Sequence, residues 1–332
     1  MISVIIPVLN EENYIATCLD SILESDFSME EMEILLVDGG SQDKTVDIVK
    51  EYMTKYANIQ WLKNPQKIVP VAMNIGIREA KGDYIVRLDA HASYPKDYFS
   101  KLIAWHQKLD ADNIGGIVQT EVINASPKTN AIKKVLSHPL GVGNSDFRVG
   151  VDELKEVDTV PFGCYPKEVF DRYGLYDERL VRNQDIELNK RIVHGGGKIY
   201  LVPDVSCVYY ARENFKDLVK NNFANGYWNI LTAFYTGTFR SLSLRHFIPL
   251  LFLLSLILPM FAAFWYTPFI WVGLLSLASY LSLVIIISLR LKNETDSFWY
   301  LLISFLTLHF SYGAGSLAGL IKVLGMKMKG KM

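Results

Sequence analysis

The sequence predicts an α/β domain built on a mostly parallel sheet, followed by a carboxyl-terminal region of transmembrane helices. Three observations carry this prediction. Short apolar runs alternate with helical patterns over residues 1–90, which is typical of βαβ units. Two long stretches after residue 246 contain no charged side chain. Charge is also divided, because only eight of the 34 basic and two of the 35 acidic residues follow residue 239.

The first 90 residues alternate between the two element types. Apolar, β-branched runs predict four strands, at 2–6, 33–37, 59–62 and 84–88. The segments between them have helical apolar spacing, at 14–23, 44–56 and 71–80. Ligands bind beyond the carboxyl ends of parallel strands. Polar clusters follow three of these strands: Asn10-Glu11-Glu12, Asp38-Gly39-Gly40-Ser41 and Asp89-Ala90-His91.

The middle of the chain is less regular. We expect a helix at 96–109, a strand at 114–122, and a Gly/Pro-rich loop at 138–143. A strand and loop at 157–164 precede a helix that Asn183 would cap, and 198–210 has the pattern of a hairpin-like pair of strands.

The last third predicts membrane attachment. Residues 247–266 and 269–289 are each long enough to cross a hydrocarbon core of about 30 Å. The third apolar segment, 298–321, contains His309 and is either a full span or a re-entrant or interfacial helix. Residues 221–239 are aromatic but polar, typical of an interfacial helix or of a core helix closing the soluble domain. The expected organisation is a soluble domain over 1–220, a linker over 221–246, a membrane region over 247–321 and a basic tail over 322–332.

Composition excludes several classes. Residues 1–239 carry 26 basic and 33 acidic groups, and this net charge of −7 argues against nucleic acid as a partner. Three widely spaced cysteines favour buried thiols over a disulfide framework or a CxxC metal site. The first residues read as a strand without a basic leader, so we expect no signal peptide and a cytoplasmic first domain.

Two strand-end aspartates are the first candidates for chemistry. Asp38 and Asp89 would share the carboxyl edge of the sheet, where a carboxylate can accept from a base N–H or a ribose hydroxyl or bind a divalent cation. Asp89 and His91 would lie on one side of an extended chain, because side chains alternate along it. A cation there would stabilise a departing pyrophosphate. The alternative is an aspartate in a turn beside a solvated histidine.

Neighbouring motifs favour the first interpretation. Pro7-Val8-Leu9-Asn10-Glu11 follows the first strand, Asp38-Gly39-Gly40-Ser41-Gln42-Asp43-Lys44-Thr45 the second, and Leu88-Asp89-Ala90-His91 the fourth. This ordered set resembles the family 2 inverting glycosyltransferases, which carry a Pro-x-x-Asn-Glu turn, an Asp-Gly-Ser-x-Asp-x-Thr loop and an Asp-x-Asp metal motif. The resemblance covers roughly residues 1–235.

The resemblance implies a GT-A fold and a set of donor-site residues. It would place Pro7 and Glu11 near the uracil of a UDP-sugar, Asp38 on the base or ribose, and Arg78 near the diphosphate. Asp89 and His91 would bind a divalent cation, Mn²⁺ or Mg²⁺, with the diphosphate. His91 replaces the family's last metal aspartate, and imidazole suits Mn²⁺ better than Mg²⁺.

The resemblance also implies a catalytic base. An inverting transfer needs one carboxylate to take a proton from the acceptor hydroxyl. Asp185 falls where the family has its Glu-Asp base motif, and Gln184 replaces the preceding acid, which keeps a hydrogen-bonding role without the charge. The alternative is that Asp185 and Glu187, in the first turn of a helix, only complement its dipole.

Further segments resemble the succinoglycan-type glucosyltransferases of bacterial exopolysaccharide assembly. They are residues 138–144, residues 157–163, Tyr176-Asp177-Glu178 and Tyr227-Trp228. This implies an acceptor loop at Phe162 and Gly163, where a glycine lets a sugar approach closely. Trp228 would stack on a sugar or anchor the chain at the membrane interface.

We therefore expect transfer of a single sugar, glucose, from a UDP-sugar to a polyprenyl-diphosphate-linked saccharide in bacterial exopolysaccharide biosynthesis. The enzyme would be a multi-pass protein of the plasma (inner) membrane with a cytoplasmic catalytic domain, in contact with lipid and with other polysaccharide assembly proteins. One alternative is transfer to a polyprenyl monophosphate. Another is a non-catalytic nucleotide-sugar-binding scaffold, which the replacements at His91 and Gln184 favour.

Overall fold

A computed structural model describes residues 1–143, 145–237, 244–294 and 296–328. The chain forms two compact units. The first comprises residues 1–119 and 146–210, and the second comprises 120–145 and 211–332 as far as they are described. Residues 329–332 of the predicted basic tail and 238–243 of the predicted linker lie outside the described residues.

The first unit is built on a mixed sheet with the strand order β3-β2-β1-β4-β8-β6-β9-β5. Its parallel half contains β1 (Ile2–Val8), β2 (Met32–Asp38), β3 (Ile59–Lys63) and β4 (Tyr84–Arg87). The other strands are β5 (Ala92–Ser93), β6 (Asn113–Glu121), β7 (Lys155–Glu156), β8 (Cys164–Pro166) and β9 (Ile199–Tyr210). Strand β8 pairs antiparallel with β4 and β6, and β9 pairs antiparallel with β5 and β7.

Helices cover both faces of this sheet, which is why its central strands are apolar along their whole length. Val4 and Ile6 of β1 enter one core, while Ile5 enters the other, as the two-residue period of a strand requires. The first core is closed by α1 (Ile15–Leu23), α2 (Thr45–Lys55) and α4 (Tyr98–Lys108). The second is closed by α3 (Val69–Glu79), α8 (Glu168–Tyr173) and α9 (Gln184–His194). The three cysteines, Cys18, Cys164 and Cys207, are buried free thiols as expected.

The strand order creates a switch point between β1 and β4. From β1 the chain builds outward through β2 and β3, then returns to place β4 on the other side of β1. Loops at the carboxyl ends of β1 and β4 therefore diverge and leave a crevice between them. The polar clusters after these two strands lie at its edge.

Three local predictions are wrong. Residues 198–210 do not form a pair of strands but one strand, β9, in which Pro203-Asp204 continues without a turn. The Gly/Pro-rich loop at 138–143 contains a helical turn, α6 (Pro139–Val142). Asn183 does not cap α9 with its side chain, because its backbone is left-handed with φ of 61°.

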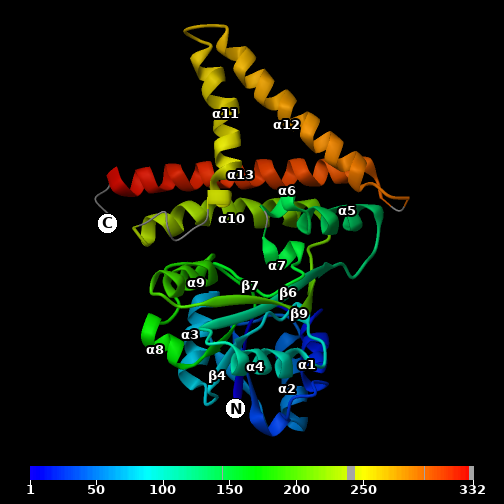
Figure 1. Cartoon of the computed structure of the whole chain (residues 1–332), viewed down its shortest axis with the longest axis vertical. Helices are drawn as coiled ribbons and strands as arrows, with labels where there is room; N and C mark the ends of the chain where they lie inside the picture. Colours follow the sequence, from blue (N-terminus) through cyan, green and yellow to red (C-terminus); the bar gives the residue numbers. More distant parts are fainter. Residues whose placement is uncertain (144, 238–243, 295, 329–332) are drawn as a thin grey trace. The chain divides into compact units, whose positions relative to one another are not determined.

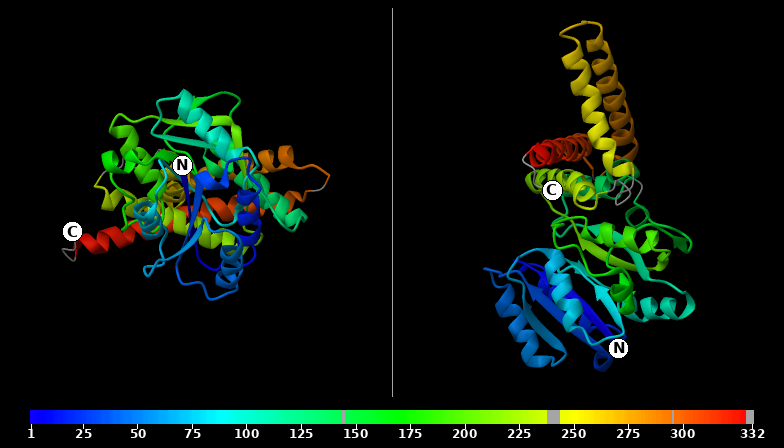
Figure 2. Two further views of the ribbon diagram at one scale, coloured as in Figure 1. Left: turned by 90° about the horizontal axis from the view of Figure 1, so that it is seen from below. Right: turned by 90° about the vertical axis from the view of Figure 1, so that its left-hand side faces the viewer.

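The second unit is helical. It contains α5 (Pro127–Leu136), α6, α10 (Phe215–Tyr235), a 3₁₀ turn η3 (Leu244–Phe247), α11 (Ile248–Ala262), α12 (Phe269–Leu291) and α13 (Phe298–Met328). Within this unit, α11 and α12 form a long hairpin and α13 runs beside α10, across the base of the hairpin (Figures 1 and 2). Three helical segments have the length and composition of membrane spans: Leu244–Ala262, Phe269–Leu291 and Phe298–Met328.

Polar contacts fix α13 to its neighbours inside the second unit. His309 donates from Nε2 to the carbonyl oxygen of Leu140 at 2.8 Å, so its Nδ1 accepts from the Tyr280 hydroxyl at 2.9 Å. Lys134 of α5 forms an ion pair with the buried Asp296 and donates to the Leu291 carbonyl at 3.0 Å. The histidine that weakens the apolar pattern of α13 therefore has partners at both ring nitrogens.

Candidate active site

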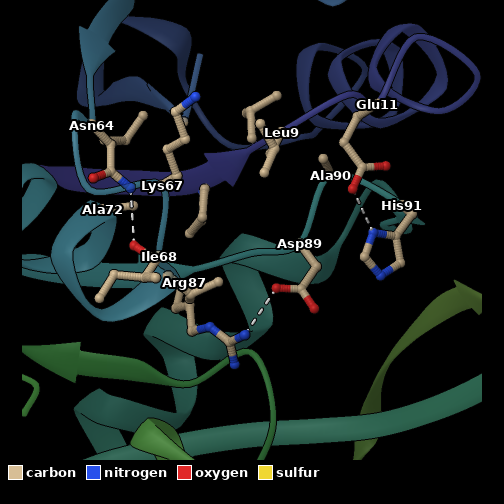
Figure 3. Close-up of a pocket in the computed structure, with 15 residues that line it drawn as sticks. Leu9, Glu11, Asn64, Lys67, Ile68, Ala72, Arg87, Asp89, Ala90 and His91 are labelled. Atoms are coloured by element: carbon tan, nitrogen blue, oxygen red, sulfur yellow. Dashed lines mark hydrogen bonds and ion pairs between the residues drawn. The ribbon is translucent and has the colours of Figure 1, made fainter. Parts of the chain in front are cut away.

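A pocket opens at the carboxyl ends of the four parallel strands, with a cavity volume of about 200 Å³ (Figure 3). Its walls come from the loops after β1, β2, β3 and β4 and from the first turn of α3. The residues that line it include Pro7, Glu11, Gly39, Lys67, Arg87, Asp89 and His91.

Hydrogen bonds between the first two loops shape one wall. The backbone N–H of Asn10 donates to the Ser41 hydroxyl at 2.9 Å, and the Asn10 side chain accepts from the N–H of Gln42 at 2.8 Å. The N–H of Glu11 donates to the Thr45 hydroxyl at 2.8 Å. Asn10 has a left-handed backbone, with φ of 57°, which asparagine tolerates better than most residues. The two motifs thus hold one another, which fixes the direction in which Glu11 points.

Asp38 folds the loop after β2. Its carboxylate accepts from the N–H of Gly40 at 2.9 Å and from the N–H and hydroxyl of Ser41 at 3.0 and 2.7 Å. It is buried, and its neighbour Gly39 rather than Asp38 lines the pocket. The predicted contact of Asp38 with a base or ribose stays a prediction, and the structure adds a turn-forming role.

Glu11 and His91 form a pair across the mouth of the pocket. His91 Nδ1 lies 3.2 Å from Glu11 Oε1, and Nε2 lies 3.3 Å from the hydroxyl of Tyr209 on β9. With Nδ1 donating to the carboxylate, Nε2 carries the lone pair that accepts from Tyr209. A carboxylate behind one ring nitrogen is the arrangement that orients metal-binding histidines.

The two residues predicted to bind a divalent cation, Asp89 and His91, lie in the same pocket. Asp89 and His91 both line the pocket and offer one carboxylate and one imidazole, a combination suited to Mn²⁺. Among the residues that the structure describes, no three His, Cys, Asp or Glu side chains converge as a metal cluster. Two protein ligands completed by phosphate oxygens and water are common for cations that bind with nucleotides.

Arg87, at the end of β4, connects two carboxylates. Its Nη2 donates to Asp89 at 2.9 Å and its Nη1 to Asp185 at 3.3 Å, while its Nε is buried without a partner among the described residues. Its side chain is only 9% exposed. Burial by itself lowers the pKa of Arg87, but the attraction of Asp89 and then Asp185 outweighs burial and holds the pKa above its usual value. The guanidinium is a permanent cation between the two acids.

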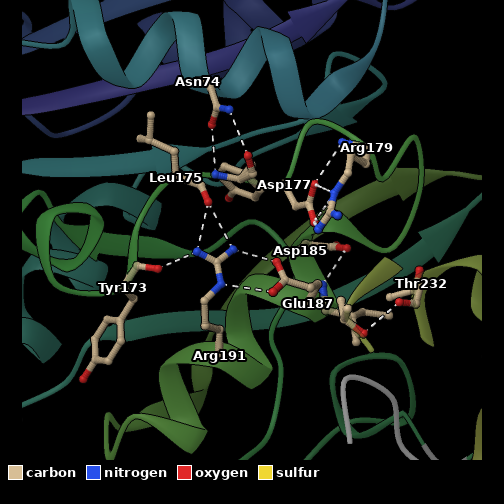
Figure 4. Close-up of polar contacts among 12 residues, drawn as sticks. Asn74, Tyr173, Leu175, Asp177, Arg179, Asp185, Glu187, Arg191 and Thr232 are labelled. Atoms are coloured by element: carbon tan, nitrogen blue, oxygen red, sulfur yellow. Dashed lines mark hydrogen bonds and ion pairs between the residues drawn. The ribbon is translucent and has the colours of Figure 1, made fainter. Parts of the chain in front are cut away.

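The two acids in the first turn of α9 have different partners (Figure 4). Asp185 points to Arg87 and is about a quarter exposed. Glu187 instead pairs with Arg191 through two bonds of 3.0 and 2.6 Å. Arg191 in turn donates to the carbonyl oxygens of Tyr173 and Leu175. Glu187 therefore stabilises the join between α8 and α9, and Asp185 remains available at the site.

The acceptor-side candidates surround Arg87 and Asp185. Phe162 has a left-handed backbone, with φ of 47°, and its ring lies 5.9 Å from the Arg87 guanidinium carbon. A side chain on Gly163 would collide with Asn113, because a Cβ there would lie 2.3 Å from Oδ1. The glycine is thus required by packing, whatever approaches the loop. Gln184 is buried, and its Oε1 has no partner in the described part of the chain.

Two predicted residues lie elsewhere. Arg78 is in the last turn of α3, 3.9 Å from Glu178, and is not among the residues that line the pocket. Trp228 lies on α10 in the second unit, packed with the apolar cluster around Ile230 and Leu231.

Lys67 and Arg87 are pocket residues that the sequence analysis missed. Lys67 follows β3 with a left-handed backbone, and its ammonium lies 3.8 Å from where a Cβ of Gly40 would stand. The sequence did indicate Lys67, because Asn64-Pro65-Gln66-Lys67 is a fourth polar cluster at the same sheet edge. Arg87 was the one charge inside the predicted strand 84–88, and a buried charge requires a partner.

Comparison with known proteins assigns the chain to a family. The model of glycosyl transferase family 2 matches residues 3–172. A Methanococcus voltae protein named dolichyl N-acetyl-α-D-glucosaminyl phosphate 3-β-D-2,3-diacetamido-2,3-dideoxy-β-D-glucuronosyltransferase is 32% identical over 254 residues, 71% of this chain and 78% of that one. Succinoglycan biosynthesis protein ExoA of Rhizobium meliloti (strain 1021) is 30% identical over 226 residues, 67% of each chain.

Solved structures agree on the fold. The mannosyltransferase PcManGT of Pyrobaculum calidifontis, in complex with GDP-Man and Mn²⁺, matches with a TM-score of 0.61 at 15% identity, over 97% of this chain and 87% of that one. TarS 1–349 of S. aureus, in complex with UDP-GlcNAc, matches with a TM-score of 0.53 at 16% identity, over 99% and 92%. These likenesses show the GT-A fold expected from the sequence. The chain belongs to glycosyl transferase family 2.

Proposed function

We propose that this glycosyltransferase is an inverting enzyme that transfers one sugar, glucose, from a UDP-sugar to a lipid-linked saccharide at the cytoplasmic face of the plasma membrane. The observation that carries the proposal is the bridge through Arg87. It joins Asp89, at the donor pocket, to Asp185, on the first turn of α9. A transfer site needs these two functions within reach of one anomeric carbon.

The donor is proposed to bind with its nucleotide along the first two loops. Pro7, Glu11 and Gly39 line the wall where a uracil and ribose would lie, with Asp38 holding the loop that carries Gly39. Lys67 supplies a cation for the diphosphate, a role that the sequence suggested for Arg78. Electrostatic stabilisation of the phosphates is what a pocket with fixed cations offers a leaving group.

Asp185 is proposed as the base. Its carboxylate takes the proton from the acceptor hydroxyl while that oxygen forms its bond to the anomeric carbon. The bond from that carbon to the diphosphate breaks on the opposite face, and UDP leaves with the electron pair. Arg87 keeps the Asp185 carboxylate oriented before the proton arrives. The free Oε1 of Gln184 can accept from a second acceptor hydroxyl.

Asp89 and His91 would hold the divalent cation, proposed as Mn²⁺. When bound, that ion neutralises charge on the departing diphosphate. The Glu11 carboxylate behind His91 would keep the imidazole oriented, and Nε2 would bind the cation in place of the Tyr209 hydroxyl.

A lipid-linked saccharide is the proposed acceptor because of the second unit and the relatives' names. Three helices with the composition of membrane spans support a site held near lipid. One relative is named for action on a dolichyl-phosphate-linked sugar, and another for succinoglycan biosynthesis. Transfer to a bare polyprenyl monophosphate is the competing possibility, and the experiment includes it.

The test uses the full chain purified in detergent, with release of UDP followed for a panel of UDP-sugars in Mn²⁺. Each donor is offered with a polyprenyl-diphosphate-linked sugar and, separately, with polyprenyl monophosphate. We expect turnover with the first acceptor only. Asp185→Asn should bind UDP-sugar normally but lose roughly 10²–10⁴-fold in kcat, the range for removing a general base. Asp171→Asn, an exposed acid on α8, is the matched control.

Each part of the proposal has its own contrary result. Wild-type turnover by Asp185→Asn means that another group is the base. Turnover only with polyprenyl monophosphate would mean that the acceptor is the bare monophosphate and not a lipid-linked saccharide. If no UDP-sugar supports turnover with either acceptor, the proposed donor class is wrong.

A further inference from the structure

The three apolar helices of the second unit differ in what surrounds them. The α11–α12 hairpin presents large apolar side chains outward along its length, including Leu258, Trp271 and Leu283. Only 6% and 11% of the two apolar windows in the hairpin are buried, against 44% of that in α13. The hairpin has the surface of helices in lipid, whereas α13 has one face covered by protein.

Close backbone packing joins α13 to α10. A Cβ on Gly315 would lie 1.9 Å from the carbonyl oxygen of Phe223, and one on Gly319 would lie 2.7 Å from that of Tyr227. From the other side, a Cβ on Gly226 would lie 2.0 Å from the carbonyl oxygen of Tyr312. Glycines spaced by four let two helices approach this closely. The two helices are therefore side by side, run in the same direction, and must lie at the same depth in or on a membrane.

The register between α10 and α13 indicates how deep α13 can lie in the membrane. Residues 315 and 319 of α13 lie beside 223 and 227 of α10, so Lys220 lies opposite the middle of the apolar segment 298–321. If α13 crossed the bilayer, Lys216, Asp217 and Lys220 would be carried into or close to the hydrocarbon core. Charges at the centre of a membrane helix are costly and therefore rare.

The other neighbour of α13 is also polar. Leu301 and Phe305 pack with Ala131 and Val135 of α5, whose other positions include Lys128, Lys133 and Lys134. Lys134 donates to the last carbonyl of α12 and pairs with Asp296 just before α13 begins. The end of the hairpin, α5 and the start of α13 therefore lie at one level. That level cannot be the bilayer centre, since it contains lysines.

We infer that α13 does not span: it lies in the membrane surface together with α10 and α5, and only the α11–α12 hairpin crosses. The partner of this layer is the headgroup region of an anionic bilayer. Basic residues at the base of the hairpin and along α13 suit it, namely Arg245, Arg290, Lys292, Lys322 and Lys327. The end of α13 at Lys327 then lies on the side from which α11 enters. This inference is independent of the proposed reaction.

Depth along the helix is the direct test. Single cysteines replace exposed residues of α13 at Ile303, Ala314 and Ile321, which span about 27 Å of helix axis. Leu283 and Leu289 of α12 serve as matched positions on a spanning helix. The native cysteines are buried and give the background in the unsubstituted chain. Each full-length variant is spin-labelled and reconstituted into phosphatidylethanolamine–phosphatidylglycerol vesicles, and label depth is measured by power saturation.

We expect one shallow depth at all three α13 positions, with Leu283→Cys deeper than Leu289→Cys. Depths that differ along α13 as much as they do along α12 overturn the inference.

The side of the membrane on which the end of α13 lies gives a second measurement. In cells, an impermeant maleimide should reach Lys327→Cys and Lys216→Cys from one face and Thr267→Cys, at the hairpin tip, from the other. Labelling of Lys327→Cys from the face that reaches Thr267→Cys also overturns it.

Discussion

Arg87, whose own side chain is nearly buried, carries one positive charge between two carboxylates. A lysine could neutralise either acid, but its single ammonium lacks the fork that reaches two carboxylates from one fixed position. The buried Nε and the ring of Phe162 beside the guanidinium further restrict what else fits there. The arrangement makes Arg87 a positioning residue for Asp185.

Substitutions of Arg87 distinguish the effect of its positive charge from the effect of its forked guanidinium geometry. Arg87→Met leaves both acids without their cation and should lower the free energy of unfolding by about 1–3 kcal/mol. Arg87→Lys should restore most of that stability but not kcat, because one ammonium cannot orient both acids. Denaturant unfolding and steady-state kinetics measure the two effects. Arg179→Met, which removes an exposed partner of Asp177, should change stability by less than about 1 kcal/mol. A lysine variant with full kcat would show that only the charge matters.

At the scale of the element, α4 is joined to β8 through a neutral histidine. His106 is buried, and its Nε2 donates to the carbonyl oxygen of Cys164 at 2.9 Å. Burial lowers the pKa of His106 below its ordinary 6.5, although the carbonyl and Asp112 oppose the shift. The unfolded chain therefore binds a proton at a higher pH than the folded chain does.

This shift sets the sign of a pH dependence. The contribution of His106 to stability is complete above pH 6.5 and is lost as the pH falls through the lowered folded pKa. We expect the unfolding temperature of the full chain to fall between pH 7.5 and 5.5, by less in His106→Gln, which retains a terminal N–H donor. Scanning calorimetry in detergent measures this. His194→Gln, at an exposed position of α9, should keep the wild-type slope. An unchanged slope in His106→Gln would assign the pH dependence to other groups.

Two glycines of α13 should respond oppositely to the same substitution. Gly315→Ala places a methyl group against the Phe223 carbonyl and should destabilise the α10–α13 pair by about 1–3 kcal/mol. Gly325 has nothing within 4 Å of its Cβ position, so Gly325→Ala should be neutral or stabilise the helix by up to about 1 kcal/mol. Loss of helicity on SDS titration compares the two variants. Equal stabilisation of both variants would mean that helix propensity, not the close contact, governs α13.

At the scale of the whole molecule, the parallel half of the sheet was predictable because both of its faces are buried. Val4, Ile5 and Ile6 are all apolar for that reason, so the strand reads directly from composition. The strand β9 was not, because Pro203-Asp204 has the pattern of a turn. In the structure Asp204 instead accepts from the indole of Trp105 at 2.7 Å, and that contact from α4 keeps the strand extended. At this position the hydrogen bond to α4 outweighs the local preference of Pro203-Asp204 for a turn.

In the candidate site too, some residues were predictable from the sequence and others were not. Asp89, His91, Glu11 and Asp185 stood at strand and helix ends, where position in the sequence already indicates position in the fold. The left-handed backbones of Asn183 and Phe162 could not be anticipated. Such a conformation is imposed by the surrounding loops, and a phenylalanine does not prefer it. Arg87 was hidden because its partner Asp185 is 98 residues away in the chain.

The bridge through Arg87 also has a consequence for the order of events. If Asp89 and Asp185 act at the donor and acceptor sites as proposed, the one guanidinium that pairs with both acids links these sites. A donor that drew Arg87 toward Asp89 would weaken its contact with Asp185 and change the affinity for the acceptor by some factor. Thermodynamic reciprocity would then require the acceptor to change the donor affinity by the same factor. Cooperativity between the two substrates would thus follow from one side chain.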